Sequence, residues 1–195
     1  MMATRPGGRT AAVRSAVLTA SADLLIENGL VGLELTAVAD RAGVGKSTVY
    51  RRWGTVSALV DDLLADMAET SRPRPSTGSL RDDLVSVARL IQRTLADRRQ
   101  GSLFKAILAA GTCDVRTAEA LAGFYQVRIG EMAPIVLDAI ERGEAPRGTD
   151  PAAVIRYVSA PLYYSLLTDT EPLRRADADR AAAAALAAVT AGVFA

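Results

Sequence analysis

Apolar residues recur along most of the chain at intervals of three and four, the spacing that gathers them on one face of an α-helix. The clearest stripes are Val13, Val17, Ala20 and Leu24; Val56, Leu59, Leu63 and Met67; and Leu80, Leu84, Val87, Ile91 and Leu95. No stretch alternates apolar and polar residues for the length that a β-strand needs. The pattern therefore predicts an all-α fold with about nine helices.

The boundaries of these helices follow from capping residues, glycines and prolines. Residues 71–79 are rich in Pro, Ser and Gly and predict a connector between a first domain, 10–70, and a second, 78–195. Residues 1–9 are expected to form a disordered arm ahead of the first helix. We expect helices over residues 10–28, two short ones within 36–53, then 55–70, 80–95, 102–110, 114–142 with a kink at Pro134, 151–168 with a kink at Pro161, and from 177 or 179 to about 193.

The stretch from Thr36 to Trp53 reads as two short helices joined by a tight turn. Thr36 can cap the first helix, and Gly43 suits the left-handed position that ends it. Val49 and Trp53 lie four residues apart, so they share one face and should pack inward. The outward face then carries hydrogen-bond donors and no carboxylate, which suits a helix that lies in the major groove of DNA: Lys46, Ser47, Thr48, Tyr50, Arg51 and Arg52.

The run Ala-Asp-Arg-Ala-Gly-Val-Gly-Lys-Ser-Thr-Val-Tyr-Arg-Arg-Trp, residues 39–53, resembles the helix-turn-helix of the TetR family of bacterial repressors. Tyr50 and Trp53 stand where that family has an aromatic pair. The resemblance extends over about residues 10–64 and implies a DNA-binding domain. One position departs from the family pattern, because Val56 replaces a lysine that commonly holds a DNA phosphate.

The resemblance and the residue chemistry together indicate a double-stranded DNA operator as partner. Lysine can donate to guanine and threonine can contact a thymine methyl, so base readout is expected from the start of the second short helix. Tyr50 is expected to hold a phosphate, and a helix N-terminus near Thr36 can bind another. The predicted DNA-binding residues are Thr36, Lys46, Ser47, Thr48, Tyr50 and Arg52. The alternative is a polar, solvated helix face.

Composition excludes several classes of site. The 195 residues carry a net charge of +1, but residues 1–60 carry +3, which localises the positive charge to the predicted DNA-binding head. There is no histidine, and the one cysteine, Cys113, permits neither an intrachain disulfide nor a multi-cysteine zinc site. We interpret Cys113 as a small core residue.

Asp61-Asp62 and Asp82-Asp83 are adjacent on helices and are interpreted as solvated charge. No catalytic residue, metal or cofactor is expected, and the chain is predicted not to be an enzyme.

The Gly45-Lys46-Ser47 sequence resembles the end of a phosphate-binding loop, but Asp40 stands where that motif requires glycine.

No apolar segment of a signal peptide occurs in residues 1–14. The most apolar run, residues 181–195, is shorter than the ~20 residues that span a bilayer. The expected location is the cytoplasm, with the nucleoid when DNA is bound, and no membrane partner is expected.

Two segments of the second half, Gly78-Ser-Leu-Arg-Asp-Asp-Leu and Ala160-Pro-Leu-Tyr-Tyr-Ser-Leu-Leu, resemble one common TetR-type regulatory domain. The resemblance implies a homodimer through the last two helices and a pocket for a small effector. Candidate lining residues are Phe104, Ile107, Leu108, Phe124, Tyr125, Arg128, Met132, Tyr163 and Tyr164. Such a lining would favour a hydrophobic or aromatic ligand. Ordinary core packing is the alternative for each residue, and Arg128 could bind an anion or pair with a carboxylate.

These observations predict a ligand-responsive, homodimeric repressor that binds a palindromic operator. In the expected mechanism, an effector in the second domain displaces the fourth helix and changes the spacing of the two DNA-reading helices. The alternative is a DNA-binding regulator of the same fold that takes no small-molecule ligand.

Overall fold

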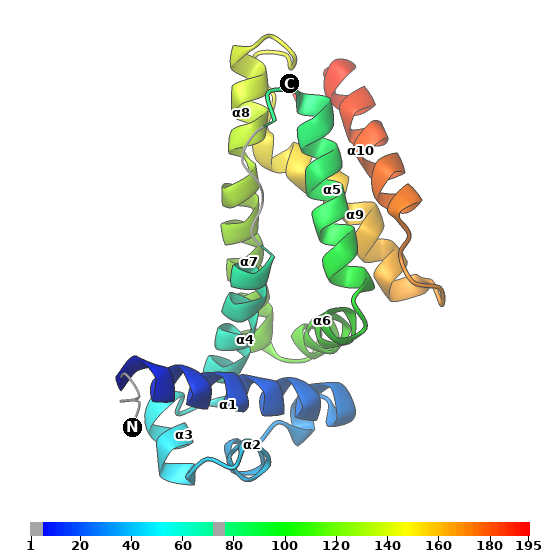
Figure 1. The fold of residues 1–195 in the computed structure, drawn as a ribbon. Helices are drawn as coiled ribbons and strands as arrows, with labels where there is room; N and C mark the ends of the chain where they lie inside the picture. Colours follow the sequence, from blue (N-terminus) through cyan, green and yellow to red (C-terminus); the bar gives the residue numbers. More distant parts are fainter. Residues whose placement is uncertain (1–5, 72–76) are drawn as a thin grey trace, which may run out of the picture. The chain divides into compact units, whose positions relative to one another are not determined.

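The computed structural model describes residues 6–71 and 77–195, with side chains from Thr10 onward in the first helix. Every regular element in these two ranges is helical, with ten α-helices and one short 3-10 helix (Figure 1). The all-α prediction is confirmed. The helices group into two compact units, which are described one at a time.

The first unit comprises Met1–Met67 and Ser102–Ala122. It contains α1 (Pro6–Asn28), η1 (Leu30–Gly32), α2 (Leu35–Ala42), α3 (Lys46–Arg52) and most of α4 (Val56–Thr70). Most of α6 (Arg98–Gly111) and the start of α7 (Val115–Met132) also belong to it. α1 packs on η1 and α2, and α2 packs on α3. The apolar stripes expected on the first and fourth helices supply its core, including Val17, Leu24, Leu59, Leu63 and Met67.

The second unit comprises Ala68–Gly101 and Gly123–Ala195. It contains α5 (Leu80–Ala96), the rest of α7, α8 (Pro134–Glu141), α9 (Pro151–Thr168) and α10 (Arg175–Thr190). α5 packs most extensively on α10, and both helices pack on α9. The core uses large side chains from α5 and α9 and alanines from α10: Leu80, Leu84, Val87, Ile155, Val158, Leu162, Ala178, Ala181, Ala182 and Ala185. The small α10 residues allow its axis to approach the neighbouring helices closely.

Capping residues explain several helix ends. The Thr55 hydroxyl accepts a hydrogen bond from the Ala58 N–H at 3.2 Å, and the Asp150 carboxylate accepts one from the Ala152 N–H at 2.8 Å. Both residue types are preferred at this position, because their side-chain oxygens satisfy N–H groups that have no partner within the helix. α9 begins at Pro151, because proline at the first helical position loses no hydrogen bond that the helix would otherwise make. It continues through Pro161 to Thr168.

Several expected boundaries differ from the structure, and one is the start of α6 at Arg98, where the sequence predicted residue 102. The helix expected over residues 114–142 is two helices, because α7 ends at Met132 and α8 begins at Pro134. Proline lacks the N–H that would continue the hydrogen-bond ladder, so a new helix starts there. α10 begins at Arg175 rather than at Asp177 or Asp179. The Asp177 carboxylate accepts a hydrogen bond from the Arg174 N–H at 2.6 Å, which places Asp177 inside the first turn.

α1 also begins earlier than expected, at Pro6 rather than near Thr10, so residues 6–9 of the expected arm are helical. Residues 1–5 of that arm, and residues 72–76 of the expected connector, lie outside the described residues. In the described part of the chain, no helix has the combination of length and apolar character that a membrane crossing requires.

Candidate nucleic-acid interface

The turn between α2 and α3 is closed by backbone hydrogen bonds that depend on Gly43. Its φ of 64° is left-handed, a conformation that glycine adopts without the steric penalty of a side chain. The Val44 N–H donates to the Ala39 carbonyl at 3.0 Å and the Gly43 N–H donates to the Asp40 carbonyl at 3.3 Å. These bonds satisfy carbonyls at the end of α2. The predicted role of Gly43 is confirmed.

One face of each short helix is buried in the first unit. Val38 and Ala39 of α2, and Val49 of α3, are fully buried, and Trp53 at the end of α3 is nearly so. The inward packing predicted for Val49 and Trp53 is confirmed. Burial of this face fixes which side chains of α3 remain outside.

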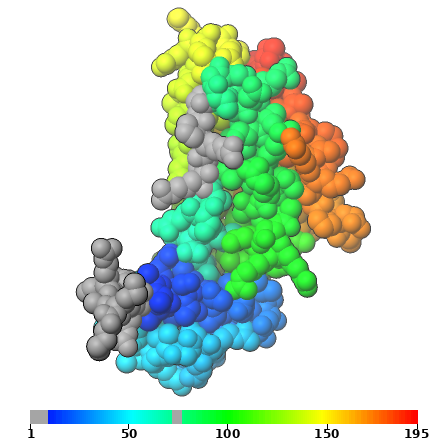
Figure 2. Space-filling model, viewed as in Figure 1, coloured from blue at the N-terminus to red at the C-terminus, as the bar shows by residue number. Residues whose placement is uncertain are grey.

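The outward face of α3 carries the predicted reading residues. Ser47 and Lys46 are exposed, Thr48 is partly exposed, and half of the Tyr50 side chain is accessible, at 50%. Lys46 lies 3.4 Å from the Asp40 carboxylate, but both groups are mostly exposed. Ion pairs of this kind contribute little free energy, so the ammonium group remains available to another anion. In Figure 2 the cyan atoms of α2 and α3 lie at the surface of this unit.

Arg52 is used differently from Lys46. Its Nη1 donates to the Thr10 carbonyl of α1 at 3.1 Å, and its guanidinium lies 4.9 Å from the centroid of the Trp53 ring. The second contact has the geometry of a cation–π interaction. The structure therefore gives Arg52 a contact within the fold as well as an exposed position.

Thr36 does not cap α2, so that expectation is wrong. The residue preceding the helix is Glu34, and it makes no side-chain capping bond. Leu35 is buried and begins the helix, which moves Thr36 into the first turn. The Thr36 hydroxyl instead lies 3.4 Å from the Glu34 carboxylate. Thr36 stays partly exposed near the N-terminus of α2, and Val56 lies partly exposed at the first position of α4.

Sequence reasoning missed a polar cluster beneath α3. Asp62 of α4 accepts hydrogen bonds from Arg14 of α1 and from the indole N–H of Trp53. Arg14 also reaches Asp66, and the hydrogen bond that Arg14 donates to Asp62 is the largest cause of the raised pKa of Arg14. Interpreting Asp61-Asp62 as solvated charge is correct for exposed Asp61 and wrong for Asp62. The four-residue spacing of Asp62 and Asp66, which places them on one helix face, was the available signal.

The two aspartates of the second pair, Asp82 and Asp83, also differ in exposure. Asp82 is exposed, whereas Asp83 is 2% exposed and accepts hydrogen bonds from the N–H and hydroxyl of Thr77 at 2.6 and 2.7 Å. Its role is structural, at the start of α5.

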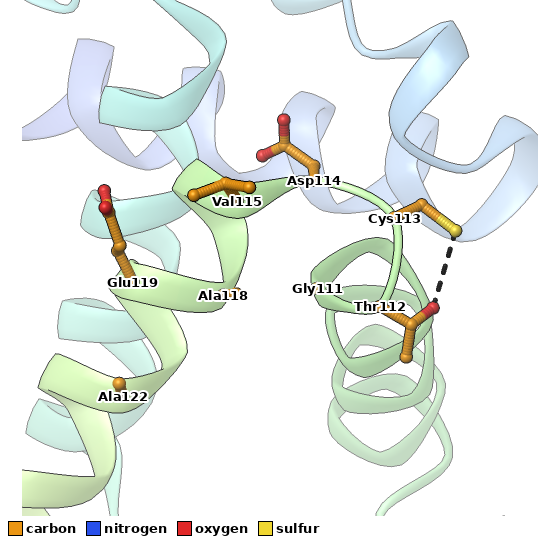
Figure 3. A pocket seen from close by; sticks show the side chains of 8 residues that line it. All are labelled: Gly111, Thr112, Cys113, Asp114, Val115, Ala118, Glu119 and Ala122. Atoms are coloured by element: carbon orange, nitrogen blue, oxygen red, sulfur yellow. Dashed lines mark hydrogen bonds between the residues drawn. The ribbon is translucent and has the colours of Figure 1, made fainter.

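The first unit contains an open pocket of about 420 Å³ at the turn from α6 to α7 (Figure 3). None of the residues expected to bind an effector lines it. Cys113 is exposed there and contacts the Thr112 hydroxyl at 3.5 Å, so the expectation that it lies in the core is wrong. The lining residues are Gly111, Thr112, Cys113, Asp114, Val115, Ala118, Glu119 and Ala122.

The residues expected to bind an effector divide between the units. Buried Phe104 and Ile107 and partly buried Leu108 belong to the first unit, and the other six belong to the second. In the second unit the ring of Tyr125 makes edge contacts with Phe124 and with Tyr163, each at 5.6 Å between centroids. The two tyrosine hydroxyls are hydrogen-bonded. Burial raises the pKa of Tyr125 to about 12 and raises that of Tyr163 further.

Arg128, Met132 and Tyr164 have different surroundings from one another. Arg128 is only 7% exposed, and it donates to the Glu131 carboxylate at 2.6 Å and to the Ser71 carbonyl at 2.5 Å. Met132 is buried in the core. Tyr164 is 69% exposed on α9, so the structure does not bring it together with partly buried Tyr163. Among the described residues, no group of three acidic or cysteine side chains is placed to bind a metal ion.

A short helix with exposed donors, held by a buried face and a glycine turn on a preceding helix, is a DNA-reading helix-turn-helix. The fold and this element define a helix-turn-helix transcriptional regulator. Two family models match the chain: "Bacterial regulatory proteins, tetR family" over residues 17–63, and "Tetracyclin repressor-like, C-terminal domain" over residues 74–185. The chain belongs to the TetR family of bacterial transcriptional regulators, which are not enzymes.

Relatives and solved structures agree with this assignment. The HTH-type transcriptional regulator YdeS of Bacillus subtilis is 31% identical over 168 residues, which cover 86% of this chain and 84% of YdeS. The flavonoid-responsive regulator FrrA superposes with a TM-score of 0.69 at 20% identity, covering 92% of this chain and 96% of that one. NalD, the secondary repressor of the MexAB-OprM multidrug efflux pump in Pseudomonas aeruginosa, has a TM-score of 0.68 at 20% identity, with coverage of 95% and 97%.

Proposed function

We propose that the protein is a homodimeric repressor that binds a palindromic operator in double-stranded DNA and is released by a small hydrophobic or aromatic effector. The observation that carries this proposal is the outward face of α3, where Lys46, Ser47 and Tyr50 are exposed above buried Val49 and Trp53. The helix has a fixed orientation in its unit and presents donors to a partner.

The order of the residues on α3 supports base reading. Lys46 and Ser47 form its first turn, and the first residues of a recognition helix are those that reach base edges. Lysine can bind guanine O6 and N7, and Thr48 can contact a thymine methyl. The Tyr50 hydroxyl is suited to a backbone phosphate. Thr36, in the first turn of α2, is suited to another, because helix N-termini attract anions.

A dimer through α9 and α10 is supported by apolar side chains that this chain leaves exposed. Tyr157, Tyr164 and Leu167 lie on one side of α9, together with exposed Ala160 and Pro161. The outward residues of α10 are largely alanine: Ala183, Ala184, Ala187 and Ala191. Two such helices and their two-fold copies would bury these faces in a four-helix bundle. A dimer would then present two α3 helices about 34–36 Å apart to a palindrome.

The effector site is proposed around Phe124, Tyr125 and Tyr163, with Arg128 and Met132 nearby on α7. Aromatic edges and buried hydroxyls suit an apolar or aromatic ligand with a few polar groups. Phe104 and Leu108 belong to the first unit, and exposed Tyr164 is assigned to the dimer face. The family model names a repressor, and FrrA is described as flavonoid-responsive. Release requires that the effector bind the DNA-free state more tightly than the DNA-bound state.

One observation favours a second candidate, a regulator of the same fold without a ligand. The donors of Arg128 already have internal acceptors in Glu131 and Ser71, as expected for a structural residue. Equilibrium binding of aromatic compounds to the full chain, followed by operator release, distinguishes the two candidates. Binding without any loss of operator affinity would favour the second.

The test of the proposed function is selection of duplexes from a random pool by the purified full chain. The expected result is a palindrome whose affinity falls with salt at a slope of roughly −0.9 per phosphate contacted. Lys46→Ala should relax the selected sequence. Lys105→Ala is the matched control, because Lys105 is the other lysine of the chain and is also exposed. Sequence-blind binding by the unmodified protein would overturn the proposal.

A further inference from the structure

Asp62 connects three helices of the first unit through one carboxylate. Its Oδ1 accepts hydrogen bonds from Nε and Nη2 of Arg14, on α1, at 2.9 and 2.7 Å. Its Oδ2 accepts a hydrogen bond from Nε1 of Trp53, at the end of α3, at 2.9 Å. Asp62 itself lies on α4. The third nitrogen of the Arg14 guanidinium, Nη1, donates to Asp66 of the same helix at 2.8 Å.

The contact with Trp53 bears directly on the reading helix. The Trp53 N–H donates to the Val49 carbonyl at 2.9 Å, so Trp53 directly continues the last turn of α3. Its ring is 8% exposed and has one polar atom, a donor. The bond to Asp62 therefore fixes the rotation of a ring that apolar packing alone would leave less defined. Arg52 lies over the same ring, which extends this contact back toward α1.

We propose that Asp62 is a positioning residue for DNA reading: its carboxylate sets the orientation of α3 against α1 and α4 by holding Trp53 and Arg14 at once. Both oxygens must act as acceptors. An amide cannot replace the carboxylate, because its nitrogen would face either the indole N–H or the guanidinium, both of which are donors. The inference rests on the proposed operator binding, and it assigns a function to a residue that does not face the DNA.

The neighbouring residue provides a matched control. Asp61 is exposed, so Asp61→Asn and Asp62→Asn remove the same charge from adjacent positions. Removing a negative charge from a DNA-binding head should strengthen binding slightly, since repulsion from phosphates falls. Asp61→Asn should show that effect. Asp62→Asn should show the opposite one for the selected operator, with affinity reduced about tenfold, while affinity for unrelated DNA rises as slightly as it does in Asp61→Asn.

The chain has one tryptophan, which gives a readout that needs no DNA. An amide nitrogen–proton correlation spectrum contains one indole resonance, that of Trp53. Asp62→Asn should move this resonance upfield and speed its exchange with solvent, and Asp61→Asn should leave it unchanged. An unchanged indole resonance in Asp62→Asn would overturn the inference, whatever the DNA measurement shows.

The binding arm compares affinity for the selected operator with affinity for an unrelated duplex, at a temperature where circular dichroism shows each variant folded. If Asp62 only stabilised the fold, Asp62→Asn would lower the melting temperature and leave the ratio of operator affinity to unrelated-duplex affinity unchanged. Trp53→Phe keeps an aromatic ring but removes the indole N–H, leaves the carboxylate and Arg14 in place, and should reduce the ratio as Asp62→Asn does. The double variant should lose no more than Asp62→Asn alone. An unaltered ratio in folded Asp62→Asn would overturn the inference. If the unmodified protein selects no duplex, the proposed operator function fails, and the indole resonance still decides whether Asp62 holds Trp53.

Discussion

Replacing Val56 by lysine should strengthen operator binding and make it more sensitive to salt. Val56 is the first residue of α4 and is only partly buried. The start of the helix is held by the Thr55 hydroxyl, which accepts the Ala58 N–H, and this bond does not involve the Val56 side chain. A lysine there can keep apolar contact through its methylene groups and extend its ammonium into solvent. The TetR family commonly has lysine at this position.

The magnitude follows from counterion release. One new phosphate contact in each half-site of a dimer adds two contacts, which change the slope of log affinity against log salt by about −1.8. Between 50 and 200 mM salt, the variant should therefore lose about twelvefold more affinity than the unmodified protein. Its advantage should be largest at low salt.

The measurement is fluorescence anisotropy of a labelled operator over a series of salt concentrations. Ala65→Lys is the control, because Ala65 is exposed on the same helix and the variant has the same added charge. A specific contact at residue 56 should steepen the slope only in Val56→Lys. Equal slopes in all three proteins would refute the placement of residue 56 at a phosphate. If the slope of affinity against salt became equally steeper in both variants, the effect would come from the added charge and not from a contact at residue 56.

Three further measurements address the dimer, a buried phenol and the turn. Glutamate at both Tyr164 and Leu167 should convert the dimer to monomer in sedimentation velocity; a persistent dimer would exclude the outer face of α9 as its interface. Burial raises the pKa of Tyr125 above its unfolded value, so the fold favours the neutral phenol. The free energy of unfolding should thus fall as pH rises from about 10 to about 12, and Tyr125→Phe should reduce that fall. Gly43→Ala should lower the free energy of unfolding by about 1–2 kcal/mol in urea titrations, because φ is 64° while no atom lies within 4 Å of the added Cβ; Gly43→Asn should lower it less.

The helix-turn-helix could be predicted from the sequence because its determinants are local. A turn glycine, two inward residues four apart and a run of outward donors all lie within 18 residues. Each of these signals acts over one or two helical turns, and the structure places Gly43, Val49 and Trp53 as expected. The exposure of Lys46 and Ser47 followed from the burial of Val49.

The features that the sequence did not predict depend on contacts between residues that lie far apart along the chain. Asp61 and Asp62 are identical in chemistry, and only the approach of Arg14, 48 residues earlier, makes one of them structural. The same limit applies to Tyr163 and Tyr164. One is partly buried against Tyr125 and the other faces outward, although both follow the same helical run. Adjacent residues on a helix point about 100° apart, so a pair of like residues is seldom in one environment.

Two basic residues of α3 show why the readers of DNA must be identified by what else they contact. Lys46 has one weak, exposed partner, and its ammonium can exchange that partner for a base or a phosphate with little loss. Arg52 donates through Nη1 to a backbone carbonyl of α1 and lies over Trp53, so its guanidinium has contacts that hold the end of the helix even where its other N–H groups face solvent. Sequence-specific discrimination is therefore expected to concentrate at the N-terminal turn of α3. Its C-terminal end is joined to Asp62 of α4 through the Trp53 indole, and this is the contact that we propose sets the angle at which the first turn is presented.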